Sequence, residues 1–269
     1  MEQNRKCKQL VFIKGAGDLA SGVALRLHRA GLRVVMTDLP VPTAIRRTVS
    51  FCPALTQGKA QVEDVVAKHA RNREQVEAAW EAGEIPVLPD PEARSLVWLK
   101  PDVLVDAILA KANMGTAIDD APIVIALGPG FTAGVDCHAV VETMRGHNLG
   151  RVYFCGSALP NTGIPGEIGG YAAERVMHAP AAGVFKGIRQ IGDMVEAGET
   201  VALVGEEPVL AKINGVLRGV LADGIYAPKG MKCADVDPRC KREHCFSVSD
   251  KARSLGGAVL EAMGALGGF

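Results

Sequence analysis

The 269-residue sequence has no excess of either charge and no long apolar run. Thirty Lys and Arg residues balance thirty Asp and Glu residues, whereas a basic stripe is the usual footprint of a nucleic-acid-binding protein. No apolar run approaches the ~20 residues that a membrane span needs. We therefore expect neither nucleic acid nor a membrane among the binding partners.

The sequence also lacks metal-site spacing and a secretory leader. The apolar run before Lys14 is too short for the core of a signal peptide. The seven cysteines are odd in number and scattered, so we expect reduced thiols in a cytoplasmic protein. Cys233, Cys240 and Cys245 lie near each other, with His244, but form no C-x2-C pair, and we expect no metal there.

What the sequence does contain is enough apolar material for a sizeable core, 48% of its residues, and one strongly patterned stretch, Leu10–Asp38. Leu10–Ile13 predicts a short buried strand. A run with 3–4 spacing of apolar residues then predicts a helix that ends at Gly31, and Leu32–Thr37 predicts a second strand. Gly22 would let the helix pack close to the sheet. This order of elements is that of a βαβ unit.

The first turn of this unit reads G-x-G-x-x-A. Gly15 would permit the tight turn, and Gly17 would let backbone N–H groups approach a phosphate at the helix N-terminus. Asp38 follows about 20 residues later, where the dinucleotide fingerprint places an acid. Asp18 would repel a phosphate that it faced, so we expect it to cap the helix instead. The alternative is a tight turn without a ligand.

Charged residues follow two of the expected strands. Arg46 and Arg47 come soon after the second strand and predict a site that neutralises a phosphate or carboxylate; a solvated basic patch is the alternative. Asp106 and Lys111 follow a strand expected at Asp102–Ala107. Ligands of open parallel sheets bind at the carboxyl ends of strands, so both are candidate binding residues, with a surface salt bridge as the alternative.

A second glycine loop follows a clearly apolar strand, Pro122–Leu127. Gly128, Gly130 and Thr132 lie in this loop, and its backbone amides are expected to face an anion. A helix is expected to begin at Asp136. Other elements are expected at 60–67 (extended), 72–81 (helix), 85–88 and 151–154 (strands) and 167–177 (helix).

Two cysteines are candidate nucleophiles. Cys137 would lie in the first turn of the helix after Asp136, where the helix dipole lowers the pKa of a thiol; the alternative is a small buried apolar residue. Cys155 follows the strand at Arg151–Phe154, in a loop rich in Gly, Pro, Asn and Ser. Such loops carry function more often than packing.

Beyond about residue 180 the pattern changes to short β-prone runs between glycine turns, which is typical of a small sandwich or barrel. Its two halves, near Gly192 and Asp223, echo each other and resemble a biotinyl/lipoyl-like barrel-sandwich fold. Carrier domains of that fold present a lysine in an A-M-K-M context. Here Lys212 is expected within a strand, Val209–Ile213, so no carried prosthetic group is expected. A closing helix is expected over Ser249–Met263, capped by its serine.

Several phrases distributed along nearly the whole chain resemble one family, the YqeB-type accessory proteins of the selenium-dependent molybdenum hydroxylase system. That family is distantly similar to the XdhC/CoxI-like xanthine dehydrogenase accessory proteins. The phrases are VFIKGAGDLASG, PTAIRRTVSF, DAILAK, ALGPGFTAGVD, VETMRGHNLGRV, GSALPNTGIPGEIGG, DVDPR and SDKAR-x-LGGAVLEA.

The resemblance implies a maturation role, in which the chain helps to prepare or insert the molybdenum cofactor, with its selenium or sulfur ligand, into a hydroxylase apoenzyme. The two glycine loops would hold the phosphates of the cofactor or of a nucleotide, and Cys155 or Cys137 would supply a soft thiolate for chalcogen transfer. A chaperone without catalysis would need the binding site alone. The competing class is an oxidoreductase that uses NAD(P), with Asp38 on the ribose; no Tyr-x-x-x-Lys pair accompanies it.

The expected fold is α/β. Residues 1–180 form a Rossmann-like domain that binds a nucleotide or cofactor, residues 181–240 form a small β-rich barrel-sandwich-like domain, and residues 241–269 form the closing helix, which could pack back on the first domain.

Overall fold

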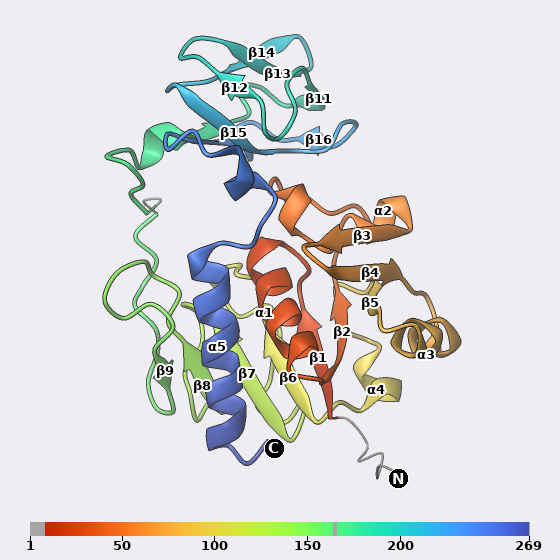
Figure 1. Ribbon diagram of the computed structural model, residues 1–269. Coiled ribbons are helices and arrows are strands. Elements are labelled where there is room, and N and C mark those ends of the chain that lie inside the picture. The colour runs from red at the N-terminus through yellow and green to blue at the C-terminus, as the bar shows by residue number, and fades with distance from the viewer. Residues whose placement is uncertain (1–8, 164–165, 269) are drawn as a thin grey trace.

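The computed structural model describes residues 9–163 and 166–268 and shows a mixed α/β protein with few helices and one large, mostly parallel sheet (Figure 1). The strands of this sheet are β1 (Leu10–Lys14), β2 (Arg33–Thr37), β3 (Lys59–Val62), β4 (Val65–His69), β5 (Ile85–Leu88), β6 (Val103–Asp106), β7 (Ile123–Leu127), β8 (Ala139–Val141) and β9 (Val152–Tyr153). The helices are α1 (Asp18–Arg29), α2 (Ala54–Gln57), α3 (Arg73–Glu81), α4 (Leu96–Leu99) and α5 (Asp250–Ala265), with 3-10 turns η1 (Arg47–Val49), η2 (Ala173–Arg175) and η3 (Arg242–Cys245).

The order of strands across the large sheet, β3-β4-β5-β2-β1-β6-β7-β8-β9, makes β1 its topological centre. From β1 the chain passes through α1 to β2 on one side, whereas β6 joins β1 later from the other side. Both neighbours run parallel to β1. In open parallel sheets, ligands bind outside the carboxyl ends of the strands at such a point of reversal. The place to look for a site is therefore the end of β1 and β6.

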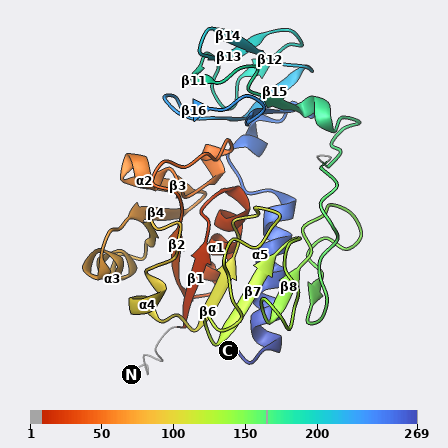
Figure 2. The ribbon, with the colours of Figure 1, turned by 180° about the vertical axis from the view of Figure 1, so that it is seen from behind.

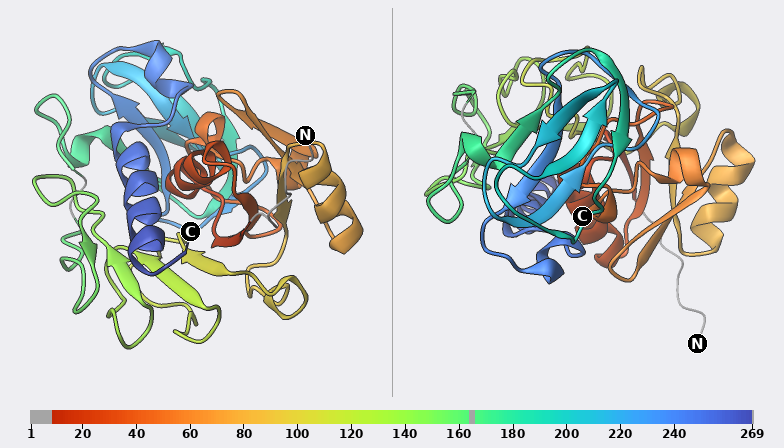
Figure 3. Two further views of the ribbon diagram at one scale, coloured as in Figure 1. Left: turned by 60° about the horizontal axis from the view of Figure 1, so that its bottom comes forward. Right: turned by 90° about the horizontal axis from the view of Figure 1, so that it is seen from above.

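Helices α1 and α5 lie side by side on one face of the large sheet (Figures 1 and 3). Glycines allow this close packing: a Cβ built on Gly22 would lie 2.5 Å from the Cβ of Ala252, and one built on Gly256 would lie 3.1 Å from the carbonyl oxygen of Gly22. Figure 2 shows the opposite face, with β1, β6 and β7 in front of these two helices. Gly22 thus serves contact with α5, where the sequence predicted contact with the sheet.

The C-terminal strands form two four-stranded sheets around one apolar core that contains Phe185, Leu217 and Val236. One sheet has the order β10 (Val176–His178), β17 (Lys232–Asp237), β15 (Gly215–Val220) and β12 (Met194–Val195). The other has the order β14 (Glu207–Leu210), β13 (Thr200–Val204), β11 (Gly183–Gly187) and β16 (Tyr226–Ala227). Figure 3 shows these strands from above, in front of the large sheet.

The segment after β2 joins the two parts of the molecule. The N–H of Val220 donates to the carbonyl of Ile45 at 2.9 Å, and Nε of Arg47 donates to the carbonyl of Val220 at 2.9 Å. A Cβ on Gly219 would lie 3.2 Å from the carbonyl of Ile45. Thr48 donates to the carbonyl of Cys245 at 2.5 Å. Hydrogen bonds from backbone and side chains therefore hold the β-rich part beyond the carboxyl ends of the large sheet.

Most elements predicted from the sequence are confirmed. The βαβ unit at the N-terminus, the strands near 85–88, 103–106, 123–127 and 152–153, and the helix after Asn72 are present. Ser249 accepts a hydrogen bond from Ala252 N, so the predicted cap of the closing helix exists, and Asn72 caps α3 by accepting one from Gln75 N. The expected extended segment at 60–67 is the antiparallel hairpin β3–β4. Among the described residues, no helix is long and apolar enough to cross a membrane.

Two predicted helices are wrong. The segment after Asp136 forms the short strand β8, because Ala139, Val140 and Val141 alternate between the two buried faces of the sheet and pair with β7. The segment 167–177 contains Gly169 and Gly170 at positive φ, 59° and 85°, which breaks a helix, and it ends in η2 and β10. The loop before it includes residues 164–165, which lie outside the described residues.

The β-rich part differs from its predicted limits in detail. Its first strand, β10, begins at Val176, before the expected boundary at residue 181. Strand β14 ends at Leu210, so Lys212 follows the strand and does not lie within it. The closing helix does return to the large sheet, as expected.

The α1–α5 contact can be tested with neighbouring glycines of one helix. We expect Gly256→Ala to lower the free energy of unfolding by about 1–3 kcal/mol, because the new methyl would overpack against Arg26 and Gly22. Gly257→Ala is the matched control: its Cβ would meet nothing within 4 Å, and alanine favours the helix by up to about 1 kcal/mol. Urea unfolding measures both; equal effects would contradict the close packing.

Candidate functional site

A cavity of about 690 Å³ opens at the carboxyl ends of β1, β2 and β6, beside the start of α1. Its volume lies in the range of small-molecule sites. Lys232 of β17 also contributes to its wall, so both parts of the molecule form it. The remaining lining combines apolar side chains (Leu19, Leu39, Ile45, Ile108, Leu109, Met114) with charged ones (Lys14, Asp18, Asp38, Arg46, Glu92).

The two glycines of the turn have different roles: Gly15 is required by the fold, and Gly17 borders the cavity. Gly15 has φ 98°, donates its N–H to the carbonyl of Thr37 at 2.8 Å, and would clash with Ala107 if it carried a Cβ. Gly17 has nothing within 4 Å of an added Cβ and lines the cavity. It is the N-cap of α1, where unpaired N–H groups and the helix dipole favour an anion. Of the two predicted glycines, only Gly17 leaves room for a ligand.

Asp38 lines the cavity and is hydrogen-bonded to the loop itself. Its Oδ2 accepts from Ala16 N at 2.8 Å and its Oδ1 from Leu39 N at 2.7 Å. Burial raises the pKa of this carboxyl group, and these two backbone hydrogen bonds oppose the rise. Asp38 therefore stabilises the turn, and neither of its oxygens is without a protein partner.

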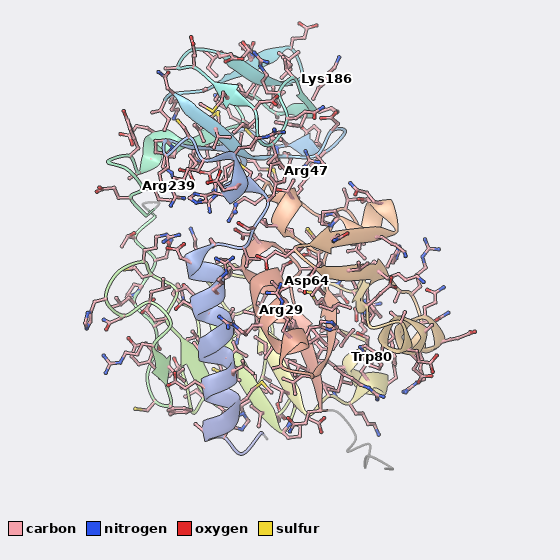
Figure 4. All side chains as sticks on the ribbon, in the orientation of Figure 1. Arg29, Arg47, Asp64, Trp80, Lys186 and Arg239 are labelled. Carbon is pink, nitrogen blue, oxygen red and sulfur yellow. The ribbon has the colours of Figure 1, made fainter. Side chains whose placement is uncertain are left out.

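Only one of the two predicted arginines lines the cavity. Arg46 lines the cavity and is nearly buried; its Nη1 lies 2.9 Å from Oδ2 of Asp18, and its buried Nε has no hydrogen-bond partner among the described residues. This ion pair explains how Asp18 is accommodated beside the glycine turn; Asp18 makes no side-chain cap. Arg47 points to the β-rich part, as Figure 4 shows, and is not among the lining residues of the cavity.

A buried polar cluster lies between β1 and β6, whose ends are paired in register at Lys14 and Asp106. Lys14 Nζ donates to Thr116 Oγ1 at 2.7 Å, and Thr116 donates to Asp106 Oδ2 at 2.6 Å. Lys14 Nζ lies 3.8 Å from the same carboxylate oxygen. Asp106 therefore pairs with Lys14, so the alternative of a surface salt bridge with Lys111 is wrong, and Asp106 itself is not among the residues that line either cavity.

The second glycine loop packs against other loops. Its candidate residues line neither the first cavity nor the second cavity described below. A Cβ on Gly130 would lie 2.6 Å from the Cα of Ala112, and one on Gly128 would lie 2.7 Å from Oγ1 of Thr143. Thr132 N donates to Oδ2 of Asp136 at 2.7 Å. Gly128, Gly130 and Thr132 are therefore placed for loop packing, and their predicted role as a second anion site finds no support in the geometry.

The two candidate thiols differ in accessibility. Cys137 is fully buried in the sheet core, and burial raises its pKa to about 12. The helix predicted after Asp136, whose dipole would lower this pKa, is absent. Cys155 is exposed in the loop after β9 and is not among the residues that line either cavity. The other described cysteines are also free, as expected, and Cys7 lies outside the described residues.

A second cavity, of about 780 Å³, adjoins the first and shares Leu19, Leu109 and Lys232 with it. Lys111 lines this second cavity, together with Lys251 of α5. Among the described residues, no group of three or more His, Cys, Asp and Glu side chains could hold a metal ion.

Sequence reasoning did not identify Lys14, Thr116, Lys232 and Lys251. Lys14 carries a usable signal, because a lysine ends an apolar strand immediately before the glycine turn. The other three come from distant parts of the chain, and no local sequence pattern predicts that Thr116, Lys232 and Lys251 lie in this region.

No family model matches the chain. It is 51% identical over 255 residues to a curated protein of Escherichia coli K12, "Uncharacterized protein YqeB", and the match covers 95% of this chain and 47% of that protein. The chain thus spans about half the length of the curated relative it matches.

Likeness to solved structures is weak. An aspartoacylase family protein of Mesorhizobium loti has 12% identity and a TM-score of 0.29, with 85% of this chain and 84% of that chain covered. A succinylglutamate desuccinylase/aspartoacylase of Rhodobacter sphaeroides has 15% identity and a TM-score of 0.27, with 85% of each chain covered. Scores this low carry no argument about fold or activity.

The buried cluster should be sensitive to loss of one charge. We expect Asp106→Ala to lower the free energy of unfolding by about 3–5 kcal/mol, because it leaves the ammonium of Lys14 buried without a counter-charge. Asp64→Ala, which removes an exposed carboxylate paired with Arg29 (Figure 4), is the control and should change stability little. Urea unfolding compares them; a small effect at Asp106 would contradict a buried ion pair.

Native alkylation tests the thiol assignments. At pH 8 we expect iodoacetamide to label Cys155 and Cys240, which are exposed, and to spare Cys137, which is buried and whose pKa is raised by that burial. Mass spectrometry of the digested protein reads each site. Rapid labelling of Cys137 in the folded protein would show that the buried thiol becomes accessible.

Proposed function

We propose that this chain binds a phosphate-bearing cofactor in the first cavity and serves in the maturation of molybdenum hydroxylases. The observation that supports the proposal best is the cavity itself, a preformed space at the switch point of a parallel sheet, where α1 begins. Binding is the part of the role that the residues support, and no catalytic step is included.

The residues around the cavity suit a phosphate ester attached to an organic ring. Gly17 leaves open space at the N-terminus of α1 for the phosphate. Arg46 has a buried Nε without a hydrogen-bond partner among the described residues, and Lys232 contributes a cation from the other side. Apolar side chains such as Ile108 and Met114 offer a surface for the ring.

We also propose a finer assignment of the fold. The βαβ unit with G-x-G-x-x-A at its first turn supports a Rossmann-like assignment for the large sheet. The two facing four-stranded sheets around one core support a barrel-sandwich-like assignment for the β-rich part. The turn of the β13–β14 hairpin is Gly205-Glu206, where a carrier domain of that fold presents a lysine.

The molybdenum cofactor is proposed as cargo on the basis of the sequence resemblance. Its pterin and phosphate match the apolar wall and the anion-binding turn in chemical type. The partner would be a hydroxylase apoenzyme. The proposal concerns this chain only, which spans about half of its curated relative.

Two parts of the sequence-based hypothesis have less support. An NAD-dependent oxidoreductase would need Asp38 to bind the ribose, and each oxygen of that carboxylate already accepts one backbone hydrogen bond, so a ribose hydroxyl would have to share it. Chalcogen transfer would need a thiolate beside the bound cofactor, and neither Cys155 nor Cys137 lines the cavity.

Thermal unfolding against a panel of ligands tests the proposal. The panel contains NAD, NADP, ATP, CTP and anaerobically prepared molybdenum cofactor. A ligand at 100 times its dissociation constant adds about 2.7 kcal/mol of stability, which shifts the Tm of a chain of this size by several degrees. We expect the molybdenum cofactor to raise the Tm and NAD to leave it unchanged.

Gly17→Val places a side chain in the open space and should abolish the shift without lowering the Tm of the free protein, because nothing lies within 4 Å of its Cβ and its φ is −70°. Gly257→Ala on α5 is the control that keeps the shift. A shift with NAD alone would favour the oxidoreductase, and a cofactor-induced shift that survives in Gly17→Val would place the ligand elsewhere.

A further inference from the structure

The second cavity differs from the first in its charge. In the first, Lys14, Arg46 and Lys232 are balanced by the carboxylates of Asp18, Asp38 and Glu92. The lining of the second has four Lys and Arg residues, Lys111, Arg145, Lys232 and Lys251, together with His178, and one carboxylate, that of Glu142. Cationic side chains therefore outnumber carboxylates in the lining of the second cavity.

The single carboxylate is held by the backbone. Glu142 is fully buried, its Oε1 accepts from Met144 N at 2.7 Å, and its Oε2 accepts from Leu159 N at 2.8 Å. Arg145 is likewise engaged, since its guanidinium binds both carboxylate oxygens of Asp250 at 2.7 and 2.9 Å. These two groups build the wall, and they leave the lysines as the cations available to a ligand.

The three lysines have no ion-pair partner among the described residues. They come from three separate parts of the chain: Lys111 follows β6, Lys232 opens β17 in the β-rich part, and Lys251 lies in the first turn of α5. Burial lowers the pKa of Lys251, a cost that a bound anion would offset. Lys111 and Lys232 are exposed and Lys251 is partly buried, so their ammonium groups are accessible to a ligand in the cavity that they line.

The two cavities adjoin each other at the start of α1. Leu19, in the first turn of that helix, lines both, and so do Leu109 and Lys232. A ligand with a phosphate at the N-terminus of α1 therefore has the lysine-lined cavity beside it. The apolar walls of the first cavity suit the ring of such a ligand, and the cations of the second cavity suit a further anionic group on the same ligand.

We propose that the second cavity is a subsite for the distal phosphate of a diphosphate-bearing ligand, held by Lys111, Lys232 and Lys251. The inference rests on the proposed function, because it takes the ring and the first phosphate to lie in the first cavity. It selects a class of ligand: a nucleotide diphosphate or a dinucleotide form of a cofactor is favoured over a monophosphate.

Inorganic pyrophosphate is the probe that isolates this subsite. Isothermal titration of the full chain should show pyrophosphate binding more tightly than orthophosphate. Lys111→Gln and Lys251→Gln should each weaken it about tenfold, the loss of one charge-assisted hydrogen bond. Lys186→Gln, the same change on β11 far from both cavities (Figure 4), is the control and should leave binding unchanged. Matching Tm values for the free variants verify that they are folded.

Gly17→Val distinguishes this inference from the proposed function. Pyrophosphate binding that persists in Gly17→Val and depends on the lysines supports the second subsite. Binding that Gly17→Val abolishes and the lysine variants leave unchanged places the anion at α1 and overturns the subsite, while the first cavity keeps its role. Equal affinity for citrate would overturn the assignment to phosphate. Lysine-dependent pyrophosphate binding without any Tm shift from the ligand panel would support the anion site and overturn the proposed function.

Discussion

The close contact between α1 and α5 is the constraint on which the rest of the structure depends. The chain leaves the large sheet after β9, builds the β-rich part, and returns as α5 to the face that α1 already covers. Gly22 and Gly256 let the two helices approach until backbone and small side chains touch. Because the β-rich part is held at both of its ends, it lies beyond the carboxyl ends of the strands. Both cavities have walls from each part for this reason.

The buried carboxylates beside the two cavities have hydrogen-bond partners within the protein. The carboxylates of Asp38 and Glu142 accept backbone N–H groups, and Asp106 accepts from Thr116 and lies close to Lys14. These bonds satisfy groups that would otherwise be costly to bury. The lysines of the second cavity lack such partners among the described residues. A site that binds an anion has this imbalance, because full internal pairing would leave nothing for the ligand.

The elements with a clear local signal were predictable, and the reason is visible in particular residues. Apolar runs predicted β1, β5, β6 and β7, and Ser249 marked the start of α5 through its cap. The segment after Asp136 was wrongly predicted as a helix. Its apolar run is too short for periodicity to distinguish a helix from a strand. Pairing with β7, a contact outside the segment, decides that it is a strand. The candidate site was found in part: Gly17, Arg46 and Lys111 line the cavities, whereas Arg47 and Gly130 contact other loops.

The sequence by itself determined the βαβ unit, its glycine turn, the β-rich character of the later chain and the closing helix. Each depends on spacing within about a dozen residues, which propensity, apolar periodicity and capping encode locally. Only the tertiary structure decided which charges meet. It paired Asp106 with Lys14, directed Asp38 to the loop, and brought Lys111, Lys232 and Lys251 to one cavity. Such contacts join residues far apart in the chain, and their geometry follows from how the sheets and helices pack.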